Sequence, residues 1–244
     1  GTGYAPAVGV LADADATLRA LHDSLPAGDG DGKTRAREAR TADRARLDAL
    51  LGEHDGQLTS VEALRAVHEV IPREATVAVD AGGFRIWALV SFPAYGPRRY
   101  VNPGSWATMG TGLPSAIGAK VADPDREVVA LTGDGGLMMC LHELHTLAAE
   151  ELDVTVVVFR NDDYAIISEE ATRSYGLEAV AYGWGETPVE FTALAESMGV
   201  AGYRAGSPEE IADTVAKARA SDGPSLVEVR TDPTEPQASE WMRR

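Results

Sequence analysis

Residues 127–163, EVVALTGDGGLMMCLHELHTLAAEELDVTVVVFRNDD, decide the fold class. Two valine-rich runs, residues 127–134 and 153–161, predict buried strands, and residues 140–151 between them predict a helix. Nearly continuous apolar strands that alternate with helices are typical of a parallel sheet covered on both faces. We therefore expect an α/β fold, with a parallel central sheet and helices on both of its faces.

The same alternation runs through residues 58–244, which are predicted to form one domain. Thr59 or Ser60 is expected to cap its first helix, because Glu62 stands near the capping-box position. Further helices are predicted at residues 59–70, 112–122, 190–198 and 208–220, and further strands at residues 75–80, 99–102, 200–205 and 225–231.

The first 57 residues have a different character. Residues 8–11 predict a short strand, which is followed by a helix with three leucines on one face. Because a lone strand and helix cannot bury their faces by themselves, residues 1–25 are interpreted as the tail of a middle domain that this chain lacks. Residues 26–57 are predicted to be a linker rich in glycine and aspartate, followed by a charged helix at residues 34–52.

The composition narrows the classes of partner. A formal charge of −16 disfavours binding to nucleic acid or to an anionic membrane through a basic surface. No apolar run is long enough for a membrane span, and we expect a cytoplasmic protein. The one cysteine, Cys140, excludes an intrachain disulfide.

The basic residues are unevenly distributed between the two types. Of 22 basic residues, three are lysines: Lys33, Lys120 and Lys217. An acidic surface with few lysines suggests adaptation to high salt, where added ions screen its self-repulsion. A GC-rich genome would also favour arginine over lysine. We expect a halophilic protein.

Two predicted strands end on residue types that commonly bind metals. The first runs into Asp134, flanked by Gly133, Gly135 and Gly136, and the second runs into Asn161. Ligands of open α/β sheets lie beyond the carboxyl ends of the strands, and one helix and one strand separate these turns, so both belong at the same sheet edge. Glycines allow an anion to approach the backbone, and a helix beginning near Leu137 would direct its N–H groups at that anion. Either turn alone is ordinary; the pair predicts a Mg²⁺ site with carboxylate, amide and carbonyl oxygens.

This pair of turns resembles the signature of the diphosphate-binding domain of thiamine diphosphate (ThDP) enzymes, and residues 101–168 look most like the large subunit of acetolactate synthase. The resemblance implies that Asp134, the Asn161 side chain and the backbone carbonyl of Asp163 are the Mg²⁺ ligands. It also implies that Gly135 and Gly136 line the diphosphate. The cofactor-binding residues that it implies around these turns are Gly133, Asp134, Gly135, Gly136, Asn161, Tyr164, Ala165 and Ile166.

Two further stretches carry the resemblance. NPGSWATMGTGLPSAIGAK, residues 102–120, is similar to a family segment in which Met109 would bend the cofactor and the Ala107 carbonyl would accept a hydrogen bond from its amino group. Bending would bring that amino group close to the reacting carbon, so that proton transfer becomes intramolecular. DAGGFRIWA, residues 80–88, looks like the family loop that reaches the diphosphate, which would place Gly82, Gly83 and Phe84 near the phosphates.

The chain also departs from the acetolactate synthase pattern. Arg160 stands where the family commonly has asparagine, and Gly83-Phe84 replaces a His/Gln-bearing loop. The substrate pocket is therefore expected to differ, with Tyr164, Ile166 and Ile167 as candidates for its lining. We assign no catalytic residue within this chain, because the family's activating glutamate belongs to a pyrimidine-binding domain of a neighbouring subunit. That domain is expected in a missing N-terminal region or a separate subunit, in a homo-oligomer such as a dimer.

The expected function is that of the ThDP- and Mg²⁺-binding portion of an acetolactate synthase-like lyase or transferase. It would decarboxylate a 2-oxo acid and ligate or release the product, and it would be inactive without the pyrimidine-binding domain. FAD would bind only through a missing domain. The alternatives are a simple decarboxylase of the benzoylformate type and a non-catalytic cofactor-binding subunit. A Rossmann site is disfavoured because no GxGxxG follows the first strand, and His142 and His145 are too close together for the HExxH zinc motif.

Overall fold

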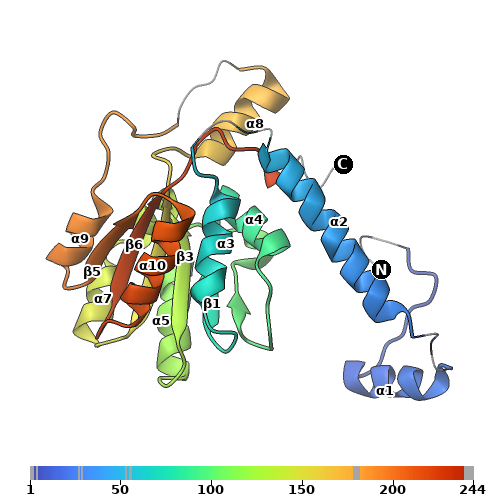
Figure 1. The fold of residues 1–244 in the computed structure, drawn as a ribbon. Coiled ribbons are helices and arrows are strands. Elements are labelled where there is room, and N and C mark those ends of the chain that lie inside the picture. Colours follow the sequence, from blue (N-terminus) through green and yellow to red (C-terminus); the bar gives the residue numbers. More distant parts are fainter. Residues whose placement is uncertain are drawn as a thin grey trace. The chain divides into compact units, whose positions relative to one another are not determined.

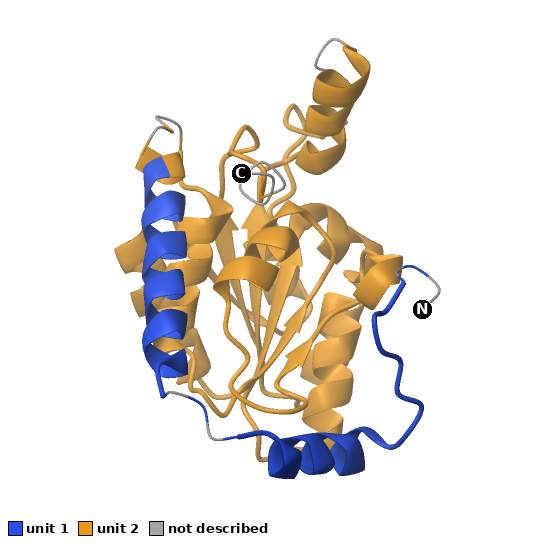
Figure 2. Ribbon diagram, turned by 90° about the vertical axis from the view of Figure 1, so that its right-hand side faces the viewer, with its two compact units in different colours: residues 1–49 blue, residues 50–244 orange. Residues whose placement is uncertain are grey.

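The computed structural model (Figure 1) describes residues 3, 5–26, 28, 30–52, 54, 57–177 and 182–238. The chain divides into two compact units, residues 1–49 and residues 50–244, which Figure 2 colours separately. No helix in the described ranges is both long enough and apolar enough to cross a membrane.

A six-stranded parallel sheet forms the centre of the second unit (Figure 1). The strand order is β2-β1-β3-β4-β6-β5, so the carboxyl ends of all six strands lie at one edge. Every strand predicted within residues 58–244 is present, and the predicted fold class is confirmed. The strands are β1 (Thr76–Val79), β2 (Tyr100–Val101), β3 (Val128–Gly133), β4 (Val154–Arg160), β5 (Ala201–Ala205) and β6 (Ser225–Arg230).

Helices cover both faces of this sheet (Figure 1). On one face, α5, α6, α7 and α9 bury apolar side chains such as Leu113, Leu144 and Phe191 against alternate residues of the strands. Burying a side chain of this size contributes about 1.5–3 kcal/mol. On the other face, α10 packs on β4, β5 and β6 and also contacts α3, which in turn contacts α4. The helices of this unit are α3 (Ser60–Val70), α4 (Gly83–Ser91), α5 (Gly112–Ala122), α6 (Asp134–Cys140), α7 (Glu143–Ala149), α8 (Ala165–Tyr175), α9 (Phe191–Ser197) and α10 (Pro208–Arg219), with a short 3₁₀ helix at Gly104–Trp106.

The capping box predicted at the start of α3 is confirmed. Thr59 is the N-cap, its hydroxyl accepts the Glu62 N–H at 3.3 Å, and the Glu62 carboxylate accepts the Thr59 N–H at 3.0 Å. These two bonds satisfy N–H groups that a helix cannot pair within itself.

Three predictions about helices were wrong. The helix predicted at residues 140–151 is the shorter α7 (Glu143–Ala149), and the helix expected to begin near Leu137 is α6, which begins at Asp134 and ends at Cys140. Leu141 and His142, which separate α6 from α7, keep right-handed helical dihedrals. The two helices are therefore separated by a local interruption of the helical hydrogen bonds. Residues 80–88 were likened to a loop, but helix α4 (Gly83–Ser91) begins within them. Helix α8 was not predicted from the sequence.

The first unit contains α1 (Ala14–Ser24) and most of α2 (Gly32–Gly52). Asp13 caps α1 by accepting the Ala16 N–H at 2.9 Å. The strand predicted at residues 8–11 was wrong: these residues form no strand, and Val8 and Leu11 are exposed. A strand needs a hydrogen-bonded neighbour, and the described part of this unit supplies none.

Candidate functional site

A cavity of about 350 Å³ lies at the carboxyl ends of β1, β3 and β4. We call it the strand-end cavity. Its volume is within the range of small-molecule and cofactor sites. All the cofactor-site and metal-site residues predicted from the sequence line this one cavity: Gly82, Gly83, Phe84, Ala107, Met109, Gly133, Asp134, Gly135, Gly136, Asn161, Asp163, Tyr164, Ala165 and Ile166.

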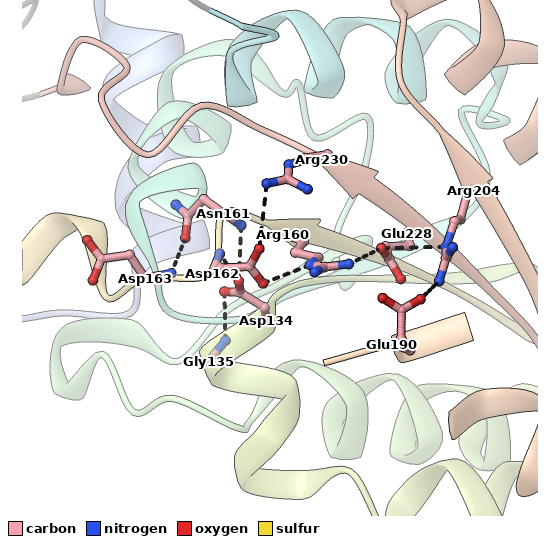
Figure 3. A network of polar contacts seen from close by, with 10 residues as sticks. All are labelled: Asp134, Gly135, Arg160, Asn161, Asp162, Asp163, Glu190, Arg204, Glu228 and Arg230. Carbon is pink, nitrogen blue, oxygen red and sulfur yellow. Dashed lines mark hydrogen bonds and ion pairs between the residues drawn. The ribbon is translucent and has the colours of Figure 1, made fainter. Parts of the chain in front are cut away.

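The Asp134 carboxylate joins the ends of β3 and β4 (Figure 3). Its Oδ2 accepts the N–H groups of Asn161 at 3.0 Å and Asp162 at 2.7 Å, and its Oδ1 accepts the Gly135 N–H at 2.8 Å. Asp134 is buried, and burial raises its pKa to about 6 although the three backbone N–H groups act in the opposite direction. The prediction that Asp134 and Asn161 share one sheet edge is confirmed.

The turn that follows β4 carries the other predicted metal ligands (Figure 3). Asn161 Oδ1 accepts the Asp163 N–H at 3.1 Å, and Asp163 Oδ1 accepts the Ser168 hydroxyl at 3.0 Å. Asp162 has a φ of 59°, a left-handed conformation that is uncommon outside glycine. A carboxylate, an amide oxygen and a carbonyl oxygen suit a hard cation such as Mg²⁺. The described residues hold no cluster of three or more His, Cys, Asp or Glu side chains that could bind a metal instead.

The two glycines after Asp134 are required by close packing. A Cβ on Gly135 would stand 2.6 Å from Tyr164 Cε1, and one on Gly136 would stand 2.4 Å from Asp80 Oδ2. The Gly135 N–H, which the resemblance assigns to the diphosphate, donates here to Asp134. Both residues nevertheless border the strand-end cavity with no side chain in the way.

Ala107 and Met109 reach the cavity from the segment between β2 and α5. Ala107 has a φ of 50°, a strained conformation for a residue other than glycine. Such residues persist only where the surrounding structure stabilises them, and they are often found at functional sites. The Met109 methyl group lies 3.3 Å from the position of a Cβ on Gly135. The bulky thioether side chain of Met109 therefore lies next to Gly135.

Phe84 lies on a helix rather than on the predicted loop. It is buried and stacks on Phe159 of β4, with ring centroids 4.9 Å apart and an interplanar angle of 6°. Gly82, directly before α4, has a φ of 157°, and a Cβ there would stand 2.7 Å from the Phe84 ring. The segment that was likened to a loop reaching the diphosphate is therefore in part a helix, and it is packed as a wall of the cavity.

Asp80 was not predicted from the sequence as a residue of the site. It follows β1 and is fully buried. Its carboxylate accepts the N–H groups of Gly110 and Thr111, both at 3.1 Å, and the Thr132 hydroxyl at 3.0 Å. Asp80 thereby ties the segment that contains Met109 to the ends of β1 and β3. A charged residue at the end of an apolar strand was the signal that could have identified it.

The cavity also has a wall from the segment after β6. Glu235 and Gln237 line it together with the three candidates for the substrate pocket, Tyr164, Ile166 and Ile167. The Glu235 carboxylate accepts the Ser60 N–H at the start of α3. Burial raises the pKa of Glu235 to about 7 despite that bond. Glu235 could not be predicted from the sequence, because its partner Ser60 is 175 residues away.

Comparison with known proteins gives a family match over this region. Residues 80–229 match the model of the family described as "Thiamine pyrophosphate enzyme, C-terminal TPP binding domain". The matched range includes strands β2 to β5, all of β6 except Arg230, and every predicted cofactor and metal residue.

Curated relatives agree with that match. The chain is 36% identical to a probable acetolactate synthase large subunit of Methanococcus aeolicus over 67% of its own length and 27% of the relative's. It is 30% identical to a catabolic acetolactate synthase of Raoultella terrigena, over 78% of this chain and 34% of the relative. A pyruvate oxidase of Lactiplantibacillus plantarum is 29% identical over 97% of this chain and 39% of the relative. The chain thus spans roughly a quarter to two fifths of the length of these relatives.

Proposed function

The chain belongs to the thiamine pyrophosphate enzyme family, in which it carries the C-terminal cofactor-binding domain, and on this premise we propose that the strand-end cavity holds the cofactor's diphosphate through Mg²⁺. Thiamine pyrophosphate is another name for ThDP. In this proposal Asp134, the Asn161 side chain and the Asp163 carbonyl ligate the metal. Gly135, Gly136 and the residues at the start of α4 border the phosphates.

The observation that carries the proposal is the position of Asp134. Asp134 is a buried carboxylate on the cavity wall, and it is hydrogen-bonded to the turn that carries Asn161 and Asp163. The carboxylate, the Asn161 amide oxygen and the Asp163 carbonyl oxygen are the hard ligands that Mg²⁺ prefers. Gly135 and Gly136 border the cavity without side chains of their own, which would let a bulky anion approach their backbone next to that cation. The cavity therefore has oxygen ligands for the metal and glycine backbone, free of side chains, for the diphosphate.

The remaining residues of the cavity would orient and shield the cofactor. Met109 and the Ala107 carbonyl would hold it bent, while Phe84 and Ile166 would exclude water from around it. When bound, ThDP supplies an electron sink for the decarboxylation of a 2-oxo acid. We propose that the complete enzyme acts on such an acid, which fits the similarity to acetolactate synthases and to a pyruvate oxidase.

Cofactor binding is tested by calorimetric titration of ThDP into the purified chain, with Mg²⁺ and with EDTA. We expect binding in Mg²⁺ only, and at least a roughly hundredfold loss in Asp134→Ala, because a metal ligand is removed. Asp125→Ala, which removes an exposed carboxylate, is the matched control and should bind normally. Circular dichroism of each variant checks the fold. Equal binding in EDTA, or in Asp134→Ala, would contradict the proposal.

Catalysis is proposed to need a pyrimidine-binding domain, in a longer form of the chain or in a separate subunit of an oligomer. With pyruvate, ThDP and Mg²⁺, the 244-residue chain is expected to release no CO₂ above background. Product analysis on the complete enzyme then separates the alternatives: acetolactate indicates ligation, acetaldehyde indicates simple decarboxylation, and no product indicates a non-catalytic subunit. Turnover by the chain alone would contradict the need for a partner domain.

A further inference from the structure

Behind the metal-binding turn lies a buried group of three charged side chains, which we call the Arg160 triad (Figure 3). Arg160, the last residue of β4, donates from Nε to Asp162 Oδ1 at 2.8 Å and from Nη1 to Glu228 Oε1 at 2.7 Å. Glu228 lies on the neighbouring strand β6. The three side chains are only 6–8% exposed.

Stability alone does not account for the Arg160 triad. Removing one cation and two carboxylates from water costs several kcal/mol per ion, and buried ion groups are often no more stabilising than apolar residues of the same size. The Glu228 Oε2 atom is buried and has no hydrogen-bond partner among the described residues. Arg204 and Arg230 approach the two carboxylates at 3.7 and 3.9 Å, but both arginines are more than half exposed, so these pairs contribute little.

An anion site does not account for the triad either. A second, open cavity next to the triad has a volume of about 530 Å³. Its lining contains three arginines and four carboxylates, so it offers an anion no excess of positive charge. The charged residues that line it are Arg160, Asp162, Glu190, Arg204, Glu210, Glu228 and Arg230.

Asp162 links the triad to the metal site. Its side chain bonds to Arg160, while its N–H donates to Asp134 Oδ2 at 2.7 Å and its carbonyl accepts the Trp184 N–H at 2.9 Å. The residue is also held at a positive φ, which leaves the turn little alternative geometry once the side chain is anchored. A Cβ on Gly183 would stand 2.1 Å from that carbonyl, so the neighbouring segment closes tightly over the turn.

We propose that Arg160 is a positioning residue for the metal site: by holding the Asp162 side chain against β6, it fixes the turn that presents Asn161 and Asp163 to the cation. The inference rests on the proposed Mg²⁺ and ThDP site. Partners behind the ligands of a metal commonly set ligand orientation, and their loss typically lowers metal affinity about 10–100-fold.

Two matched variants of the triad test this role. Asp162→Gly and Glu228→Gln each remove one carboxylate, and each leaves Arg160 paired with the other, so neither leaves an unpaired buried arginine. Glycine adopts a positive φ without strain and keeps the N–H that donates to Asp134. Only Asp162→Gly releases the turn from Arg160.

The measurement is the Mg²⁺ concentration that half-saturates ThDP binding by the full 244-residue chain, with the Mn²⁺ electron paramagnetic resonance signal as a second readout. We expect Asp162→Gly to raise it about tenfold or more, and Glu228→Gln to leave it within about threefold of wild type. Asp162→Asn should rescue binding, because asparagine tolerates the left-handed region and keeps a side-chain oxygen for Arg160.

The outcomes separate the two ideas. If wild type shows no metal-dependent ThDP binding, the proposed function fails and this inference fails with it. If wild type binds but Asp162→Gly binds equally well, or weakens binding no more than Glu228→Gln, the inference alone is overturned. Should Asp162→Gly not fold, Arg160→Lys replaces it: lysine keeps the charge without the planar fork that reaches both carboxylates, so the half-saturating Mg²⁺ concentration should rise. An unchanged value would overturn the inference.

Discussion

At the scale of single residues, the Asp80 carboxylate holds the segment around Met109 in place. In Asp80→Ala, the buried Thr132 hydroxyl and the half-buried N–H groups of Gly110 and Thr111 would lose the Asp80 carboxylate as an acceptor. Leaving buried polar groups unpaired costs about 1–3 kcal/mol each, so we expect the free energy of unfolding to fall by roughly 3 kcal/mol. Urea denaturation monitored by circular dichroism measures this. A loss below about 1 kcal/mol would mean that the segment is held by its other contacts.

Glu235 predicts a dependence of stability on pH. Its pKa in the folded chain is about 7, above its ordinary value of 4.5, so its contribution to stability is present below pH 4.5 and is lost as the pH rises through 7. Asp232 and Glu62 add to this by repelling its negative charge. Glu235→Gln keeps an oxygen for the Ser60 N–H but cannot ionise. We therefore expect it to be more stable than wild type at pH 8.

The advantage of Glu235→Gln should be larger at pH 8 than at pH 5 by on the order of 2 kcal/mol. Urea denaturation of both proteins across this range, without ligand, gives the difference. Glu186→Gln, which neutralises an exposed carboxylate, should show no such trend. A parallel pH dependence of wild type and Glu235→Gln would mean that Glu235 titrates normally.

The sequence identified the site residues that belong to local motifs and missed those defined by distant contacts. Asp134 and Asn161 were predicted to lie together because the connection between their strands is short and regular. The contact of Asp80 with Thr132 spans 52 positions, and that of Arg160 with Glu228 spans 68. Nothing in one sequence reports such pairs, because they depend on strand order and register.

At the scale of elements, helix α5 contains a matched pair of glycines. A Cβ on Gly112 would stand 2.7 Å from the Asp80 Cβ, whereas one on Gly118 would meet nothing within 4 Å. Gly112→Ala should therefore destabilise the chain by about 1–3 kcal/mol through overpacking. Gly118→Ala should stabilise it by about 0.5–1 kcal/mol, because alanine is the better helix former. Thermal unfolding of both variants measures the effects; shifts of the same sign would contradict this packing.

The elements also show which patterns a sequence reveals. Buried strands such as β3 and β4 were predicted nearly to the residue, since a valine run between turns has few other interpretations. Helices α4 and α8 were not predicted. Each begins within or directly after a segment that was interpreted only as a loop or turn: a glycine-rich segment for α4 and a polar turn for α8. Residues 8–11 have a strand's composition, but they pair with no strand in the part of the chain that the structure describes, so composition was misleading there.

At the scale of the whole molecule, the net charge of −16 predicts a dependence of stability on salt. Self-repulsion opposes the compact state and is screened as the Debye length falls to about 3 Å at 1 M salt. The melting temperature should therefore rise by several degrees between 0.05 and 1 M KCl, then level off. Calorimetric scans across this series provide the test. A flat response would contradict the halophilic interpretation, and a continued linear rise would indicate general salting-out instead.

The central claim is that Asp134, Asn161 and Asp163 ligate the cation that holds ThDP. Its most direct test is a crystal structure of the chain grown with ThDP and Mn²⁺, with the metal located by anomalous scattering. The account predicts an anomalous peak within about 2–2.5 Å of an Asp134 carboxylate oxygen, Asn161 Oδ1 and the Asp163 carbonyl, with the diphosphate beside Gly135 and Gly136. A metal peak or bound diphosphate elsewhere on the chain, with the strand-end cavity filled by solvent, would contradict it.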